Sequence, residues 1–227
     1  MCGRFTRHHT WAEIWAMYRL LDAEKGRNTE ARYNIAPTQD VLFVTAGDGG
    51  FQQVREGRWW LVPSWAKEIP KYALFNARSE DAAEKPSFRD SFKSKRCLIP
   101  ADGFYEWTKN AEDGGKDPWH IFMPEHRPFS FAGLWAYNPA MDVTSCTILT
   151  AAAQEPMREL HDRQPVILDP AAYDAWLDPA TSVADAKALL QHDVDGQLQF
   201  YRVSRAVNAT RGAEDRAEMI EPQGHSS

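Results

Sequence analysis

Apolar residues recur three and four positions apart near the start of the chain, from Trp11 to Leu21. They follow directly on the capping-box sequence Thr10-Trp-Ala-Glu13. This pattern predicts a helix over about residues 11–22. Shorter patterns, helped by the helix-starting residues Asp169-Pro170 and Ser182, predict helices at 155–161, 170–177 and 182–191.

Runs typical of β-strands dominate the middle of the chain. Segments 41–45 and 52–60 flank a glycine-rich turn and predict an antiparallel pair. Because the helical segments do not alternate regularly with the strands, we expect an α+β fold with a largely antiparallel, barrel-like β-sheet flanked by helices. Further strands are expected at 96–100, 103–108, 118–123, 129–136, 144–151, 165–168 and 198–204, with an exposed hairpin loop at 109–116.

Composition indicates a chain that folds without crosslinks. Hydrophobic residues make up 43% of its 227 residues, enough for a substantial core in a single domain. We expect this domain to span residues 1–222, followed by a small, polar and flexible tail at 223–227. Three cysteines give no even disulfide framework, and no segment has the length and apolarity of a membrane span or an export signal. A cytoplasmic, monomeric protein is the expectation.

The overall charge speaks against generic nucleic-acid binding. The chain has 26 basic and 32 acidic residues, a formal net charge of −6. Its long-range field therefore does not attract polyanions, and any nucleic-acid site requires a local basic patch. The histidines show no spacing typical of metal ligands, so neither a metal nor another cofactor is expected.

Cys2 is the most informative single residue. A small residue at this position normally permits removal of Met1, which would make cysteine the N-terminus. Its α-amine, with a pKa of about 7.7–8.0, and its thiol, with a pKa near 8.5, would then lie on adjacent carbons. Together they can condense with an aldehyde to give a thiazolidine ring. The alternative is that Cys2 is only a small residue at a frayed terminus.

Two further residues are candidates for proton transfer. Glu106 follows the turn Asp102-Gly103 and should lie on a strand among aromatic neighbours, where its pKa could be raised. His161 ends a short helical turn before Pro165. Each has a plain alternative, because Glu106 could be an edge-strand surface residue and His161 an ordinary hydrogen-bonded histidine.

A set of short motifs covers nearly the whole chain: Met1-Cys-Gly-Arg-Phe5, Asn34-Ile-Ala-Pro37, Asn76-Ala-Arg-Ser-Glu80, Lys85-Pro-Ser-Phe-Arg89, Asp102-Gly-Phe-Tyr-Glu-Trp107, Leu149-Thr-Ala-Ala-Ala153, His161-Asp-Arg163 and Val203-Ser-Arg-Ala-Val-Asn208. No single motif is decisive. In this order, however, the set resembles the SRAP (SOS response-associated peptidase) family, which includes sensors that crosslink to abasic sites in single-stranded DNA.

The resemblance implies a division of labour at the site. Cys2 would form the thiazolidine with the ring-opened abasic sugar, and Asn76 would orient the reacting groups of Cys2. Glu106 would act as acid and base, and His161 would shuttle protons. Because some family members cleave the strand by β-elimination from the imine, a lyase side activity is also implied.

The same resemblance implies the nucleic-acid contacts and the partner, single-stranded DNA containing abasic sites. The protein would be nucleoid-associated when bound. Arginines would contact phosphates, one tryptophan would stack on a base, and other residues would wedge next to the lesion. The phosphate contacts are Arg4, Arg78, Arg163 and the Thr150 hydroxyl, with Lys85, Arg89 and Arg205 as weaker candidates; Trp65 is the stacking residue, Pro37 and Trp107 are the wedges, and Asn34 is a polar contact.

Two other functions remain open from the sequence. An N-terminal cysteine can act as the nucleophile of an autoproteolytic peptidase, with its own amine as base. Such an enzyme needs an oxyanion hole and a peptide cleft, whereas an aldehyde trap needs an arginine-lined groove. Arg4, Arg78 and Arg163 favour the trap. A non-catalytic single-stranded DNA-binding module is the other alternative, with Cys2 and Glu106 incidental.

Overall fold

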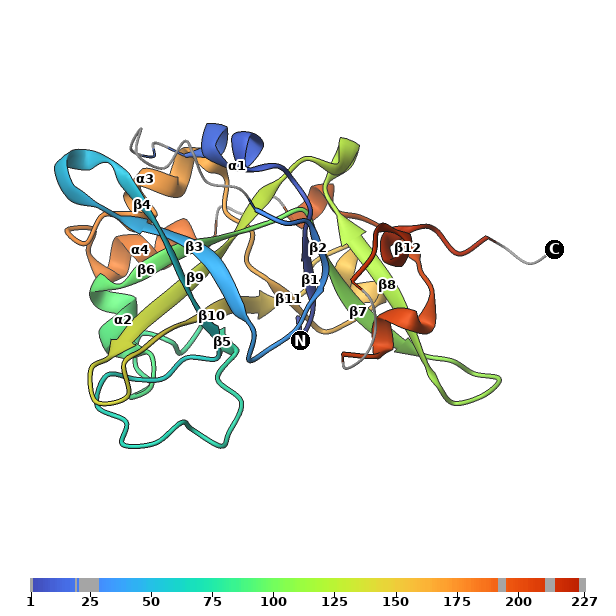
Figure 1. Ribbon diagram of the computed structural model, residues 1–227, viewed down its shortest axis with the longest axis horizontal. Coiled ribbons are helices and arrows are strands. Elements are labelled where there is room, and N and C mark those ends of the chain that lie inside the picture. Colours follow the sequence, from blue (N-terminus) through green and yellow to red (C-terminus); the bar gives the residue numbers. More distant parts are fainter. Residues whose placement is uncertain (1, 19, 21–28, 192–194, 211–214, 225–227) are drawn as a thin grey trace.

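The computed structural model describes residues 2–18, 20, 29–191, 195–210 and 215–224 (Figure 1). Five of its strands form a closed barrel in the order β10-β4-β3-β6-β9, and pairing of β9 with β10 closes the ring. Neighbouring strands are antiparallel except β4 and β10, which are parallel. The barrel strands are β3 (Asp40–Ala46), β4 (Gln52–Trp59), β6 (Arg96–Ala101), β9 (Phe129–Asn138) and β10 (Val143–Ala152).

Side chains alternate between the inside and the outside of this barrel. In β6, Cys97 and Ile99 belong to the interior cluster, whereas Leu98 belongs to the outer cluster beneath the helices. This period of two follows from the pleat of a β-strand. Two short strands, β5 (Asn76–Arg78) and β11 (Arg163–Pro165), extend the sheet by pairing with β10.

A second, antiparallel sheet of five strands lies beside the barrel, with β6 leading into β7 through the single residue Asp102. Its order is β12-β8-β7-β1-β2. Cys2 and Phe5 pack with the barrel interior, so the two sheets share one core. The strands are β1 (Phe5–Arg7), β2 (Arg32–Ile35), β7 (Gly103–Lys109), β8 (Lys116–Phe122) and β12 (Gln199–Arg202).

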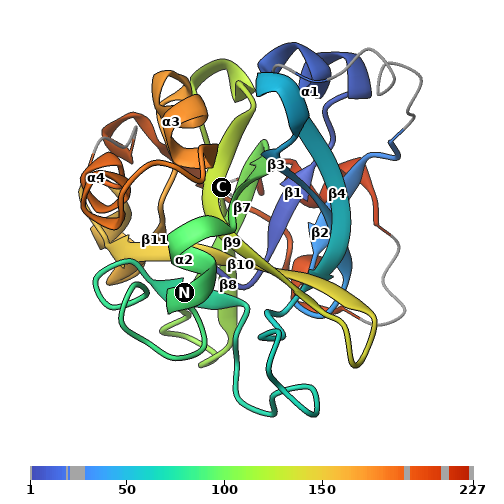
Figure 2. The same ribbon diagram turned by 90° about the vertical axis from the view of Figure 1, so that its left-hand side faces the viewer.

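The helices are short and cover the outside of the barrel. Figure 2 shows α2, α3 and α4 gathered on one side, with α1 set apart from them. Buried Arg96 fixes this layer, because its guanidinium donates to the carbonyl oxygens of Trp176 (2.6 Å) and Phe92 (2.8 Å). The helices are α1 (Trp11–Met17), α2 (Arg89–Ser94), α3 (Tyr173–Leu177) and α4 (Val183–Leu189). No helix of the described segments is long and apolar enough to span a membrane.

The α+β class with a barrel-like, mainly antiparallel sheet is confirmed, but several element boundaries differ. The first helix has its expected capping box yet ends at Met17, because Tyr18 turns to extended backbone and its hydroxyl meets the buried Ser130 hydroxyl at 2.5 Å. The helix expected at 155–161 is only a 3-10 turn, Met157–Glu159. Strands β1, β2 and β5 were not predicted, since three or four residues are too few to show a period. Residues 225–227 of the expected tail lie outside the described residues.

His120 is a fully buried histidine in β8, with rings of Tyr105 and Phe122 beside it. Its Nε2 lies over Gly103, where an added Cβ would come within 2.1 Å of that atom, so only glycine fits there. Within the described part of the chain, neither ring nitrogen has a hydrogen-bond partner. Burial lowers the pKa of His120 from 6.5 to about 3, so the folded protein holds this ring neutral.

This buried ring predicts acid-sensitive stability. Below about pH 6.5 the unfolded chain protonates His120, whereas the folded chain does so only near pH 3. The free energy of unfolding should therefore fall as the pH drops through this window, by up to about 1.4 kcal/mol per pH unit from this group. In urea unfolding between pH 4.5 and 7, the free energy of unfolding should depend less steeply on pH in His120→Leu than in the parent. Equal slopes for His120→Leu and the parent would refute this assignment.

Candidate active site

Cys2 lies just ahead of β1 and is completely buried against the barrel interior. Its thiol donates to the Arg4 carbonyl oxygen at an Sγ–O distance of 3.7 Å. Burial, and then the negative charge of Glu106, raises the pKa of the Cys2 thiol well above its ordinary value. The thiol is therefore protonated at neutral pH and needs a neighbouring base to react. Since Met1 precedes it in the sequence, the Cys2 amine is free only after Met1 is removed.

Asn76 touches Cys2 directly. It is the first residue of β5, and pairing with Ile148 of β10 fixes its backbone position. Its side-chain Nδ2 donates to the Cys2 carbonyl oxygen at 2.8 Å. Its Oδ1 is buried, and no described residue donates a hydrogen bond to it. An acceptor left open beside Cys2 suits an N–H donor such as a free α-amine.

Glu106 is buried in the middle of β7, so it is not an edge-strand surface residue. Burial raises the pKa of Glu106 above its ordinary value. The raised pKa agrees with the sequence-based expectation, but its cause differs. The rings of Tyr105 and Trp107 lie together on the opposite face of the strand, 6.4 Å apart, so the core and not these aromatics desolvates the carboxyl group.

His161 follows the 3-10 turn Met157–Glu159 and is partly exposed. The backbone N–H of Arg163 donates to its Nδ1 at 2.9 Å, which places the proton of the neutral ring on Nε2. A carboxylate oxygen of Asp162 also lies 2.9 Å from Nδ1. His161 is close enough to Glu106 for its charge to lower the pKa of that carboxyl group.

The fold thus gathers the four sequence-predicted catalytic residues, which are up to 159 positions apart in the chain, from four different segments. Asn76 bonds Cys2, the charge of Glu106 acts on the Cys2 thiol, and His161 acts on Glu106. A thiol, a carboxyl group with a raised pKa and an imidazole at the surface form a relay between a buried nucleophile and solvent. A set of side chains of this kind can provide a nucleophile that attacks a carbonyl carbon and can transfer the protons that this addition requires.

Two of the expected DNA contacts, Arg4 and Trp107, line a shallow pocket of about 420 Å³ next to Cys2, together with Gly3, Lys116 and Asn208. The Arg4 guanidinium donates at 2.6 Å to both Asn34 Oδ1 and the Val207 carbonyl oxygen, and lies 5.5 Å from the centre of the Trp107 ring. Arg4 and Asn34 are therefore fixed by protein contacts at the edge of this pocket.

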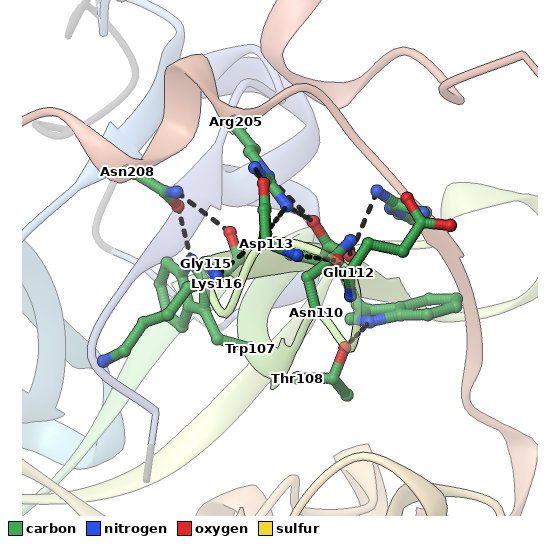
Figure 3. Close-up of polar contacts among 12 residues, drawn as sticks. Trp107, Thr108, Asn110, Glu112, Asp113, Gly115, Lys116, Arg205 and Asn208 are labelled. Carbon is green, nitrogen blue, oxygen red and sulfur yellow. Dashed lines mark hydrogen bonds and ion pairs between the residues drawn. The ribbon is translucent and has the colours of Figure 1, made fainter.

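The neighbouring β7–β8 loop, expected as an exposed hairpin, is shown in Figure 3. Asn208 accepts a hydrogen bond from Trp107 Nε1 at 2.7 Å and donates to the Lys116 carbonyl oxygen at 3.1 Å, so it holds the Trp107 ring in place. Neither this role of Asn208 nor the place of Lys116 in the pocket could be predicted from the sequence. The guanidinium of Arg205 contacts the carboxylates of Asp113 and Asp117, which occupy it within the protein.

The other predicted phosphate contacts differ in accessibility. Arg78 is exposed and forms no ion pair with any described residue. Arg163 instead makes a bidentate pair with Glu80 at 2.5 and 2.9 Å and donates to the Thr150 carbonyl oxygen at 2.7 Å. The Thr150 hydroxyl is buried and donates a hydrogen bond to the Ala77 carbonyl oxygen. It also accepts a hydrogen bond from the Arg163 guanidinium and so helps to hold that side chain in place. The partner Glu80 was not expected from the sequence, although it belongs to a quoted motif.

The remaining candidates lie farther out on the surface. The Trp65 side chain is 54% exposed and available for stacking, and Pro37 is half-buried beyond the end of β2. Like Arg205, the other two weaker basic candidates have acidic neighbours, with Lys85 3.6 Å from Asp81 and Arg89 3.6 Å from Asp90.

The chain is thus a barrel-containing α+β protein whose buried Cys2 accepts a hydrogen bond from Asn76 and lies within the electrostatic influence of Glu106. Residues 1–210 match the model of the family described as SOS response associated peptidase (SRAP), and the chain belongs to that family. It is 36% identical to abasic site processing protein YoaM of Bacillus subtilis, with 99% of this chain and 100% of that protein aligned.

Two more similarities agree with this. Abasic site processing protein YoqW of Bacillus subtilis is 38% identical, over 97% of this chain and 99% of that protein. A crystal structure of a Bacteroides thetaiotaomicron protein has a TM-score of 0.82 at 21% identity, covering 98% of this chain and 100% of that one, which establishes the shared fold.

Proposed function

We propose that this protein processes abasic sites in single-stranded DNA by covalent capture through Cys2. The observation that carries the proposal is the contact of Asn76 with Cys2 beside the buried Glu106, whose charge acts on the Cys2 thiol. The relatives named abasic site processing proteins support the choice of substrate. The opened sugar of an abasic site supplies the aldehyde that such a group can attack.

Capture proceeds in two steps once Met1 has been removed, formation of an imine and closure of the thiazolidine ring. The Cys2 amine forms a bond to the aldehyde carbon, and the resulting carbinolamine loses water to give an imine. Protonated Glu106 is suited to supply the proton that leaves with this water. The thiol then adds across the C=N bond, so that sulfur bonds to carbon and the thiol proton ends on nitrogen. The product is a thiazolidine, and the net loss is one water.

Proton transfer is what the rest of the site provides. Because the pKa of the Cys2 thiol is raised, the thiol must give up its proton as it attacks, and Glu106 is a base within electrostatic reach. His161 at the partly exposed end can return protons to solvent. From the imine, a base can instead remove a sugar proton and expel the 3′ phosphate, which is the lyase side activity.

The DNA contacts in this proposal are the exposed or surface-facing groups around the site. Arg78 and Arg163 would bind phosphates, Trp65 would stack on a base, and Trp107 with Pro37 would wedge beside the lesion. Arg4 and Asn34 would shape the pocket next to Cys2. In this arrangement Thr150 contributes by holding Arg163.

An autoproteolytic peptidase is the second candidate, since the family description includes that activity. It would need a reactive thiolate, whereas burial raises the pKa of the Cys2 thiol. Incubating the purified protein with an abasic oligonucleotide and, separately, with a peptide library distinguishes the functions. A covalent DNA adduct supports capture, cleaved peptides support the peptidase, and DNA binding without an adduct indicates a passive binding module.

Phosphate contacts predict a salt-dependent phenotype. Arg78→Ala and Arg163→Ala should each weaken binding to undamaged single strands and reduce the slope of log K against log salt by about 0.7. Glu80→Gln should strengthen binding, because it frees the Arg163 guanidinium from its bidentate partner. Fluorescence anisotropy at several salt concentrations measures all three.

Lys187→Ala is the matched control for these variants, because it removes one partly exposed positive charge that already has an acidic neighbour, Glu84, and is not among the candidate DNA contacts. Its salt slope should stay close to that of the parent. An unchanged slope in Arg78→Ala or Arg163→Ala would remove that arginine from the DNA interface.

A further inference from the structure

Two adjacent histidines meet a buried carboxylate just beyond the end of β1. His8 Nε2 lies 3.2 Å from Asp102 Oδ1, and His9 Nδ1 lies 2.9 Å from Asp102 Oδ2. One donor atom from each of the three residues lies within 4.8 Å of the other two. None of these residues takes part in the proposed capture of abasic sites, so the cluster calls for its own explanation.

The carboxylate of Asp102 is held rigidly. Its side chain is fully buried, and it accepts hydrogen bonds from the Thr6 hydroxyl at 2.5 Å and from the backbone N–H groups of His8 (2.5 Å) and His9 (3.1 Å). Such outer hydrogen bonds are what orients a carboxylate ligand.

The His8 ring is held in place by stacking on two neighbouring rings. It stacks between His9, with ring centres 5.2 Å apart, and Tyr33, with ring centres 5.4 Å apart. Its Nε2 atom is buried and, although in ion-pair range of Asp102, makes no geometrically acceptable hydrogen bond to any residue of the described segments. A buried ring nitrogen without a hydrogen-bond partner can bind a metal ion when it is unprotonated.

We propose that His8, His9 and Asp102 form a binding site for one divalent transition-metal ion of the zinc type. Zinc binds histidine nitrogen at about 2.0–2.1 Å and carboxylate oxygen at about 2.0–2.2 Å, so ligand atoms at tetrahedral corners are roughly 3.3 Å apart. Each imidazole nitrogen lies close to this separation from one of the two carboxylate oxygens, His8 Nε2 3.2 Å from Oδ1 and His9 Nδ1 2.9 Å from Oδ2. Binding requires the two stacked imidazoles to rotate until their nitrogens converge.

A water molecule would take the fourth coordination position. The side chains of His8 and His9 are 21% and 14% exposed, so a water molecule can complete four-fold coordination. Imidazole and carboxylate ligands suit Zn²⁺, Co²⁺ and Ni²⁺ better than Mg²⁺ or Ca²⁺, which prefer all-oxygen sites. Sequence spacing missed the site because Asp102 lies 93 residues from His9.

The test uses the full chain, stripped with a chelator and titrated with Co²⁺ and with Zn²⁺. We expect one ion per chain, with the visible absorption of tetrahedral Co²⁺ and displacement by Zn²⁺. His8→Asn and His9→Asn should each weaken binding at least about tenfold, because each removes a ligand. The matched control is His161→Asn, which removes a described histidine outside the cluster and should bind as tightly as the parent.

A second measurement guards against misfolded variants. Thermal unfolding without metal shows whether His8→Asn and His9→Asn fold, and added Zn²⁺ should raise the midpoint of the parent and the control but not of these two variants. Failure to bind a stoichiometric ion would overturn the proposal. So would Co²⁺ spectra and affinities that are the same in the parent and in both folded variants. Neither outcome bears on DNA capture, which is read from the covalent adduct.

Discussion

Replacing Cys2 by alanine is expected to abolish the covalent adduct with abasic single-stranded DNA. The side chain supplies the sulfur that closes the thiazolidine, and Cys97 and Cys146 cannot replace it, because their backbone nitrogens lie in peptide bonds and cannot form the imine on which a thiol closes. An alanine N-terminus keeps an amine and can form only a reversible imine. Denaturing gels of protein incubated with an abasic oligonucleotide measure this effect, and the adduct band should disappear.

The matched controls are Cys146→Ala, which removes a buried thiol away from the site, and Cys2→Ser. Cys146→Ala should keep the full yield of adduct. Cys2→Ser should give an adduct that is trapped only when a reductant converts the imine to an amine, since a hydroxyl closes the ring poorly. A stable, unreduced adduct with Cys2→Ala would show that the nucleophile has been misassigned.

Changing Glu106 to glutamine is expected to slow capture by about 10²–10⁴-fold, the usual contribution of a general acid or base. The raised pKa of Glu106 gives this effect a pH dependence. As an acid, Glu106 acts only while protonated, so the water-loss step should slow as the pH rises through its pKa. Because the pKa of Glu106 is raised, this decrease in rate should occur closer to neutral pH than it would with an ordinary carboxyl group. In Glu106→Gln the decrease should be absent.

His161→Ala should also slow capture without abolishing it, because Cys2 keeps its own reactivity. Single-turnover rates from pH 5 to 9 at saturating DNA separate these chemical defects from weaker binding. Glu112→Gln is a suitable control, since it makes the same change in the exposed hairpin loop. Parent-like rates for both Glu106→Gln and His161→Ala at every pH would make these residues structural.

The features that were predicted best from the sequence are those that depend only on neighbouring residues. The capping box at Thr10 starts α1, and the turn at Asp102-Gly103 leads into the strand that carries Glu106, both as predicted. The end of α1 could not be predicted, because Tyr18 leaves the helix for a contact with Ser130, 112 residues away. Helix propensity cannot report such a tertiary contact.

Side-chain partners were the least predictable part of the site. Motif order pointed to Arg163, but only the fold shows that Glu80 occupies its guanidinium, across 83 residues of sequence. In the same way, burial explains the raised pKa of Glu106 better than the aromatic neighbours that the sequence suggested. Residue type and strand position could be inferred locally, whereas partners and solvent exposure depend on long-range packing.

The intact mass of the protein after incubation with an abasic oligonucleotide tests covalent capture by Cys2 most directly. The comparison uses two preparations, one that begins at Cys2 and one that retains Met1. We predict an adduct only for the first, with the summed mass of protein and oligonucleotide less one water, and with the modification located on Cys2 after digestion. An adduct of equal yield on the Met1-containing protein, or one located on another residue, would contradict capture through the amine and thiol of Cys2.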